Sequence, residues 1–153
     1  MRVTFRKLVE QRVSTWDALR GERTRVPGAT MALGRGGLPH DLIQFVVEGT
    51  LALDRGFWGS VEAGATFKST GRKRTRTGRA VIARNRKELD AAEHIVNEHY
   101  LRWKLGQPTP VAARLDEMAR RWEVLGDRGE LTLEWPSCRV LDHVMSPSDP
   151  SRR

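Results

Sequence analysis

Polar side chains suited to acid–base or metal chemistry fall together at helical spacing in residues 38–67. His40, Gln44 and Glu48 are each four residues apart, and Asp41 lies two helical turns before Glu48. Side chains at these separations share one face of a helix. The spacing therefore predicts a polar helix face, on which His40, Asp41 and Glu48 are the candidate catalytic residues.

A second polar cluster further along the chain contains His94 and His99. Two helices that meet face to face can bring imidazole and carboxylate ligands together, as they do in the metal sites of helical bundles. The candidate ligands of a divalent metal are therefore His40, Glu48, His94 and His99. Beyond that metal the sequence predicts no cofactor. The alternative interpretation is structural, with a helix cap and the solvated side of an ordinary core helix.

The other candidate site is a run of basic residues. Residues 68–87 hold nine Lys or Arg and no acidic residue, whereas the other 133 residues carry 18 basic and 19 acidic groups. Cations gain affinity for nucleic acid by releasing the counterions of its phosphates. The candidate anion-binding residues are Lys68, Arg72, Lys73, Arg74, Arg76 and Arg79.

The basic run has no aromatic residue and so no platform for stacking bases. Any binding to nucleic acid should therefore depend weakly on base sequence. An acidic protein is the other partner that the charge suits, and an inert solvated loop is the structural alternative. The function that we expect is binding of an anionic partner, nucleic acid or acidic protein. The alternative is a metal-dependent enzyme that uses the central helix, so the sequence leaves open whether the protein is an enzyme.

Length and composition set broader bounds. A chain of 153 residues suits one domain with a real core. No run of 18 apolar residues is present, so we expect no membrane span. The single cysteine, Cys138, excludes an intrachain disulfide, and the charged N-terminus lacks the apolar core of a signal peptide. These features predict a cytoplasmic protein of undetermined oligomeric state.

The periodicity predicts an α+β fold in which a small antiparallel sheet packs against three to four helices. Alternating residues indicate N-terminal strands and a C-terminal strand at 130–135, while 12–19 suits a helix or a strand. Pro39 suits the first turn of a helix, whose apolar residues from Leu42 to Leu53 cover most of its circumference. The further expected elements are a short second helix ending at Gly64, a basic flexible loop at 68–78, a long helix at 80–105 and a helix capped by Thr109 and closed by Gly126. We expect a single domain at 1–135 and a mostly disordered tail at 136–153.

The central block reads LPHDL…FVVE…GFWGSV. In this block the chain resembles a family of small bacterial proteins that has no established activity. The resemblance covers residues 1–105 and implies a short β-rich start followed by helices. Members of this family often have a His where this chain has Gln44, so the chain lacks the His-Asp-x-x-His pattern that they show. The resemblance supports a fold outline and implies no function.

Overall fold

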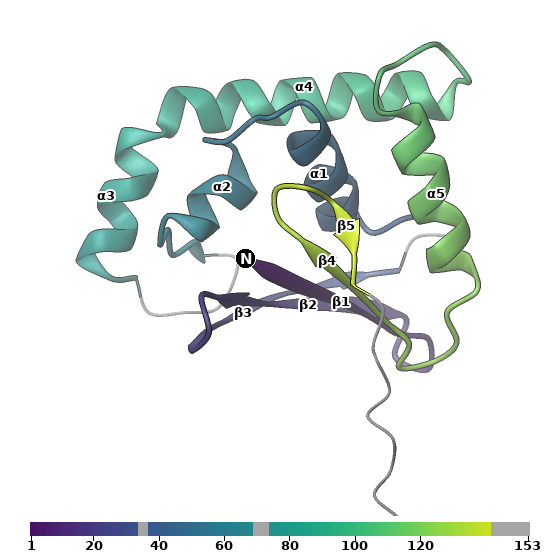
Figure 1. Ribbon diagram of the computed structural model, residues 1–153, viewed down its shortest axis with the longest axis horizontal. Coiled ribbons are helices and arrows are strands. Elements are labelled where there is room, and N and C mark those ends of the chain that lie inside the picture. Colours follow the sequence, from purple (N-terminus) through teal and green to yellow (C-terminus); the bar gives the residue numbers. More distant parts are fainter. Residues whose placement is uncertain (34–36, 69–73, 142–153) are drawn as a thin grey trace, which may run out of the picture.

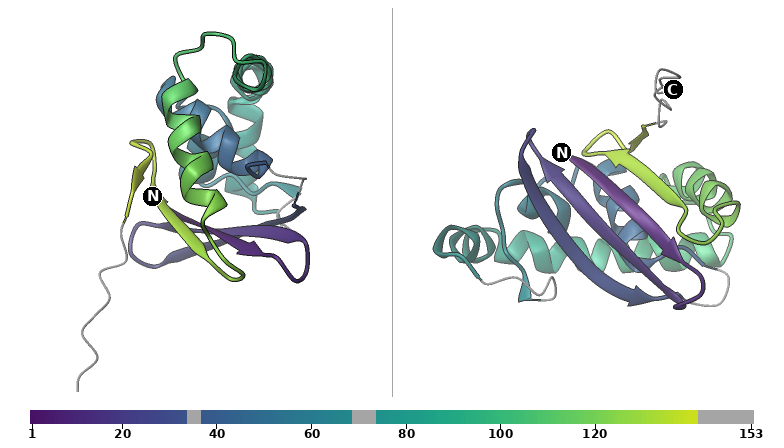
Figure 2. Two further views of the ribbon diagram at one scale, coloured as in Figure 1. Left: turned by 90° about the vertical axis from the view of Figure 1, so that its right-hand side faces the viewer. Right: turned by 90° about the horizontal axis from the view of Figure 1, so that it is seen from below.

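The computed structural model describes residues 1–33, 37–68 and 74–141. In these parts of the chain, five strands form one antiparallel sheet and five helices cover one of its faces (Figure 1). None of the described helices lies on the opposite face of the sheet, as the view from below shows (Figure 2). The predicted α+β class is confirmed.

The sheet has the strand order β3-β2-β1-β4-β5. Its strands are β1 (Arg2–Leu8), β2 (Val13–Arg20), β3 (Thr24–Ala32), β4 (Glu130–Glu134) and β5 (Arg139–Val140). Because side chains alternate across a strand, Val3 and Phe5 of β1 point into the core, opposite Leu133 and Leu131 of β4. The predicted pairing of the N-terminal strands with the C-terminal strand is therefore confirmed, and the ambiguous segment 12–19 is a strand.

The fold continues beyond the domain boundary expected at residue 135. Strand β5 pairs with β4, and the side chain of Cys138 is buried just before it. Residues 142–153, which make up most of the expected tail, lie outside the described residues.

Helix α1 lies between the sheet and the long helix α4 (Figure 1). All seven residues from Leu42 to Glu48 are buried, as expected for a helix that is apolar over most of its circumference. The helices are α1 (His40–Thr50), α2 (Phe57–Glu62), α3 (Arg76–Arg84), α4 (Arg86–Lys104) and α5 (Ala112–Glu123). No helix in the described part of the chain is long and apolar enough to cross a membrane.

Three helix boundaries differ from the prediction. The expected helix at 80–105 is two helices that meet at Asn85, whose buried side chain donates to Ser60 Oγ at 3.1 Å. Helix α3 begins at Arg76, so the end of the expected flexible loop at 68–78 is helical, and residues 69–73 lie outside the described part. Helix α5 begins at Ala112, and Thr109 does not cap it. The Thr109 hydroxyl instead lies 2.7 Å from a ring nitrogen of His99 on α4.

An aromatic cluster fills the core between α1, α2 and the sheet. The ring of Trp58 lies 4.7 Å from Trp16, 5.2 Å from Phe45 and 5.7 Å from Phe5, measured between centroids, in edge-to-face contacts. Its side chain is completely buried. Trp58 therefore anchors the core.

Candidate functional site

The exposed cations just before α3, on α3 and at the start of α4 form a surface that we call the basic corner. It consists of Arg74, Arg76, Arg79, Arg84, Arg86 and Lys87, all of them exposed. Lys68 is also exposed, while the predicted Arg72 and Lys73 lie outside the described residues. Figure 1 shows α3 turning away from α4 at one end of the molecule, so that the corner is convex.

The orientation of α3 is set by close packing at one glycine. A Cβ atom on Gly78 would lie 2.2 Å from Thr66 Oγ1 and 2.8 Å from Thr66 N, so only glycine lets the helix approach this closely. The Thr75 hydroxyl caps the helix by accepting from Gly78 N at 2.9 Å, and Val81 is buried on the same side. Because this face is buried, the arginines on the opposite face project into solvent.

The cations of the basic corner are not paired in salt bridges in the described part of the chain. None of them forms a salt bridge within the described part of the chain, whereas eight arginines elsewhere in that part do. Glu88, the first acidic residue after the corner, is already paired with Arg55 at 3.2 Å. Arg84 Nε donates to the side-chain oxygen of Asn85, at 3.5 Å. Lys87 lies close enough to Glu88 to help lower the pKa of that carboxyl group. The corner is thus a positively charged surface whose cations form no salt bridge among the described residues.

Glu48, on the polar face of α1, has a structural role. It is fully buried, and its two carboxylate oxygens accept from the backbone N–H groups of Phe57 and Trp58, each at 2.9 Å. Gln44 Nε2 donates to the same carboxylate at 2.9 Å. Gly56 leaves the space, because a Cβ there would lie 2.5 Å from the carboxyl carbon. Glu48 therefore holds the start of α2, and burial raises its pKa to about 7.

The other two candidate catalytic residues lie at the beginning of α1. Asp41 accepts a hydrogen bond from Trp16 Nε1 at 2.8 Å, which links α1 to β2. His40 is half-exposed, with Nδ1 3.8 Å from Asp41 and Nε2 3.9 Å from Glu93 of α4. The Asp41 carboxylate raises the pKa of His40 above its usual value, and Glu93 acts in the same direction.

The four candidate metal ligands do not converge. His94 is exposed on α4, and His99 is engaged with Thr109 at 2.7 Å. Glu48 directs its oxygens to backbone N–H groups of α2. In the described residues, no three His, Cys, Asp or Glu side chains come together in an arrangement that could hold a metal ion. The geometry therefore lends no support to the metal hypothesis.

Cys138 lies in the core, with Sγ 3.6 Å from the carbonyl oxygen of Phe45. Burial raises the pKa of its thiol to about 11, so that it is protonated near neutral pH. A buried, protonated thiol suits a packing role and not that of a nucleophile.

Three cations of the basic corner were not among the predicted site residues. Arg84, Arg86 and Lys87 follow the apolar residues of α3, where the expected continuous helix would have spread their side chains around its circumference. The bend at Asn85 ends α3 after Arg84 and starts α4 at Arg86, and all three cations are exposed at this bend. All three belong to the run of residues 68–87 that contains no acidic residue, and this sequence feature could have placed them among the predicted anion-binding residues.

Comparisons of the chain with models of protein families, with curated proteins and with solved structures find no match. The family resemblance of residues 1–105 therefore stays a prediction, and the functional case rests on the geometry of the chain itself.

Proposed function

We propose that this protein binds nucleic acid through the basic corner, by contacting the phosphate backbone. The observation that carries the proposal is the exposure of six neighbouring cations with no salt-bridge partner among the described residues. A surface of this kind has an electrostatic potential that attracts a polyanion. Binding to phosphates would supply the ion-pair partners that the described residues do not provide.

The chemistry and size of the corner suit phosphate. Five of its six cations are arginines, whose planar guanidinium group can donate two parallel hydrogen bonds to one phosphate. Helix α3 has nine residues and is about 13 Å long. Double-stranded DNA carries one charge per roughly 1.7 Å of its axis, so a surface of this length faces several phosphates.

Base-specific recognition is not expected. The basic segment contains no aromatic side chain to stack on a base, and its cations extend from a convex surface. Phosphate contacts position a protein on a duplex but carry no direct sequence information. The proposed binding is therefore strongly dependent on salt and weakly dependent on sequence.

The test is fluorescence anisotropy with a labelled DNA duplex and its RNA equivalent over a range of salt concentrations. The triple variant Arg76→Gln, Arg79→Gln, Arg86→Gln removes three contacts. We expect it to lower the slope of log K against log salt by about 2.7 and the affinity at 0.1 M salt on the order of 100-fold.

A matched control removes the same charge elsewhere. Arg2, Arg23 and Arg120 are exposed and form no salt bridge in the described residues, so the triple Gln variant at these positions should keep most of the affinity. Equal losses in the two triple variants would contradict the proposed location. If polyglutamate binds as tightly as the duplexes, the partner is an acidic protein and the nucleic-acid proposal fails.

A further inference from the structure

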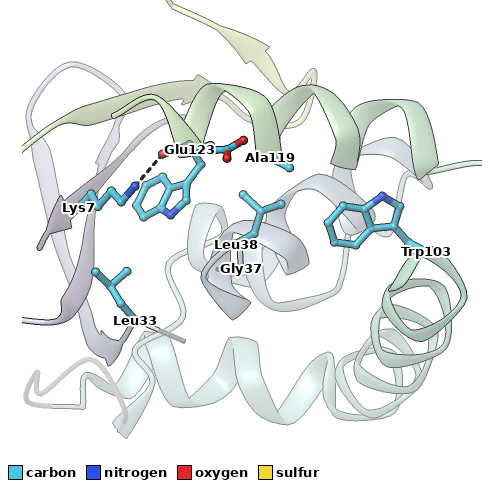
Figure 3. Close-up of a pocket in the computed structure, with 8 residues that line it drawn as sticks. Lys7, Leu33, Gly37, Leu38, Trp103, Ala119 and Glu123 are labelled. Carbon is cyan, nitrogen blue, oxygen red and sulfur yellow. Dashed lines mark hydrogen bonds between the residues drawn. The ribbon is translucent and has the colours of Figure 1, made fainter. Parts of the chain in front are cut away.

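A pocket lies at the other end of the molecule from the basic corner, where β1, α4, α5 and the approach to α1 meet (Figures 1 and 3). Its volume is about 280 Å³. It is lined mainly by apolar and aromatic side chains, among them Leu33, Leu38, Trp103, Ala119 and Trp122, with Lys7 at one side. Ligand pockets typically have volumes of about 300 to 1,000 Å³. This pocket lies just below that range, which limits its ligand to a small molecule of one or two rings.

Other residues hold the two indoles of the pocket in place. Trp103 Nε1 donates to Asp116 Oδ1 at 2.8 Å, which fixes the ring on α4 relative to α5. The Lys7 ammonium lies 5.7 Å from the centre of the Trp122 ring and donates to the Trp122 carbonyl oxygen at 3.0 Å. Aromatic surfaces that are already ordered lose little conformational entropy when a flat ligand packs against them.

The charges at the pocket favour an anionic ligand. Lys7 is half-buried and uses one of its three ammonium donors on Trp122, and no carboxylate in the described residues lies within salt-bridge distance of it. Glu123 also lines the pocket, but its side chain is exposed. Water and salt screen an exposed charge more effectively than a half-buried one, so Lys7 has the stronger influence on a bound ligand.

We propose that this pocket binds a small aromatic carboxylate, with its ring packed against the indoles and its carboxylate paired with Lys7. Figure 3 shows Lys7 and Trp103 on opposite sides of the pocket with Leu38 between them, which suits a ligand that is charged at one end and apolar at the other. The proposal does not depend on nucleic-acid binding, since none of the residues of the basic corner lines the pocket.

The test compares three probes that share a naphthalene ring: 1-naphthoate, its neutral alcohol 1-naphthylmethanol and its cationic amine 1-naphthylmethylamine. Binding to the full ¹⁵N-labelled chain is followed through the five tryptophan indole N–H resonances. We expect 1-naphthoate to shift the resonances of Trp103 and Trp122 most. It should bind about tenfold more tightly than the alcohol, as a charge-assisted hydrogen bond to Lys7 implies.

Two lysine variants test the role of the charge. Lys7→Met should reduce naphthoate binding about tenfold, to the level of the alcohol. Lys104→Met is the matched control, because Lys104 also lies over an aromatic ring, 5.5 Å from the centre of Tyr100, but does not line this pocket. It should leave binding unchanged.

Four results would overturn the proposal. They are the absence of naphthoate binding, shifts of similar size at all five indoles, binding of the alcohol or amine at least as tight as that of naphthoate, and equal effects of the two lysine variants.

Discussion

Replacing Glu48 with Gln should change how the stability of the protein depends on pH. Burial raises the pKa of Glu48 from its ordinary 4.5 to about 7 in the folded protein. Between these two pH values the folded state binds a proton that the unfolded state has released, so stability falls as pH rises. The loss from this one group is about 3 kcal/mol, because each tenfold change in a protonation equilibrium is worth about 1.4 kcal/mol. It is complete once the pH has passed about 7.

The variant removes this dependence at a cost that does not vary with pH. Glu48 accepts from the backbone N–H groups of Phe57 and Trp58 with its two oxygens. A Gln side chain has only one oxygen, so its NH₂ group would face one of these two N–H donors. An unsatisfied buried donor costs about 1 to 3 kcal/mol. We therefore expect Glu48→Gln to be less stable than the wild type by about that amount at pH 4.5, and close to it or slightly more stable at pH 8.5.

The measurement is urea denaturation at pH 4.5, 6.5 and 8.5. At each pH, the free energy of unfolding of Glu48→Gln is subtracted from that of the wild type. This difference should change by about 3 kcal/mol between pH 4.5 and pH 8.5. Glu98→Gln is the control, because Glu98 is an exposed residue of α4 paired with Arg102 at 3.7 Å, and its profile should run parallel to the wild type. A parallel profile for Glu48→Gln as well would refute the burial of an ionisable carboxylate with a raised pKa.

Further predictions concern α3 and the start of α1. Gly78→Ala should destabilise the protein by about 1 to 3 kcal/mol in urea denaturation, because the new methyl group would press against the backbone of Thr66. Gly126→Ala is the control, because a Cβ at that position meets nothing within 4 Å, and it should have little effect. Equal effects of the two variants would contradict the packing of α3. His40 should titrate above 6.5 in an NMR pH titration, and Asp41→Asn should move its pKa back toward that value. The stabilisation from charged His40 should be complete below pH 6.5 and disappear as pH rises through the pKa in the folded state; a pKa at or below 6.5 would contradict the arrangement of charges.

Most of the sheet and its partners could be predicted from the sequence. The alternation of Val3 and Phe5 in β1, and of Leu131 and Leu133 in β4, indicated strands with one buried face. The break between α3 and α4 could not be predicted in this way. Asn85 is neither Gly nor Pro, and its partner Ser60 lies 25 residues earlier in the chain, so no local pattern marks the bend.

For the candidate site, too, one part could be predicted from the sequence and another part is set by the tertiary structure. The concentration of positive charge in residues 68–87 is a property of the sequence alone and is independent of folding. The tertiary structure decides which of those cations are exposed and whether they form salt bridges. Both outcomes depend on the contact of Gly78 with Thr66 and on the bend at Asn85. Neither contact leaves a periodic pattern.

The helical spacing on α1 determined that His40, Asp41 and Glu48 would share a region of the helix. It did not determine what they do. Only the tertiary structure brings the backbone of α2 to Glu48 and the Trp16 indole to Asp41. Periodicity reports neighbours within a few residues, whereas burial and hydrogen-bond partners are set by packing between distant segments. For this reason the sequence could locate the polar residues, and the fold alone decided that Glu48 and Asp41 hold elements together.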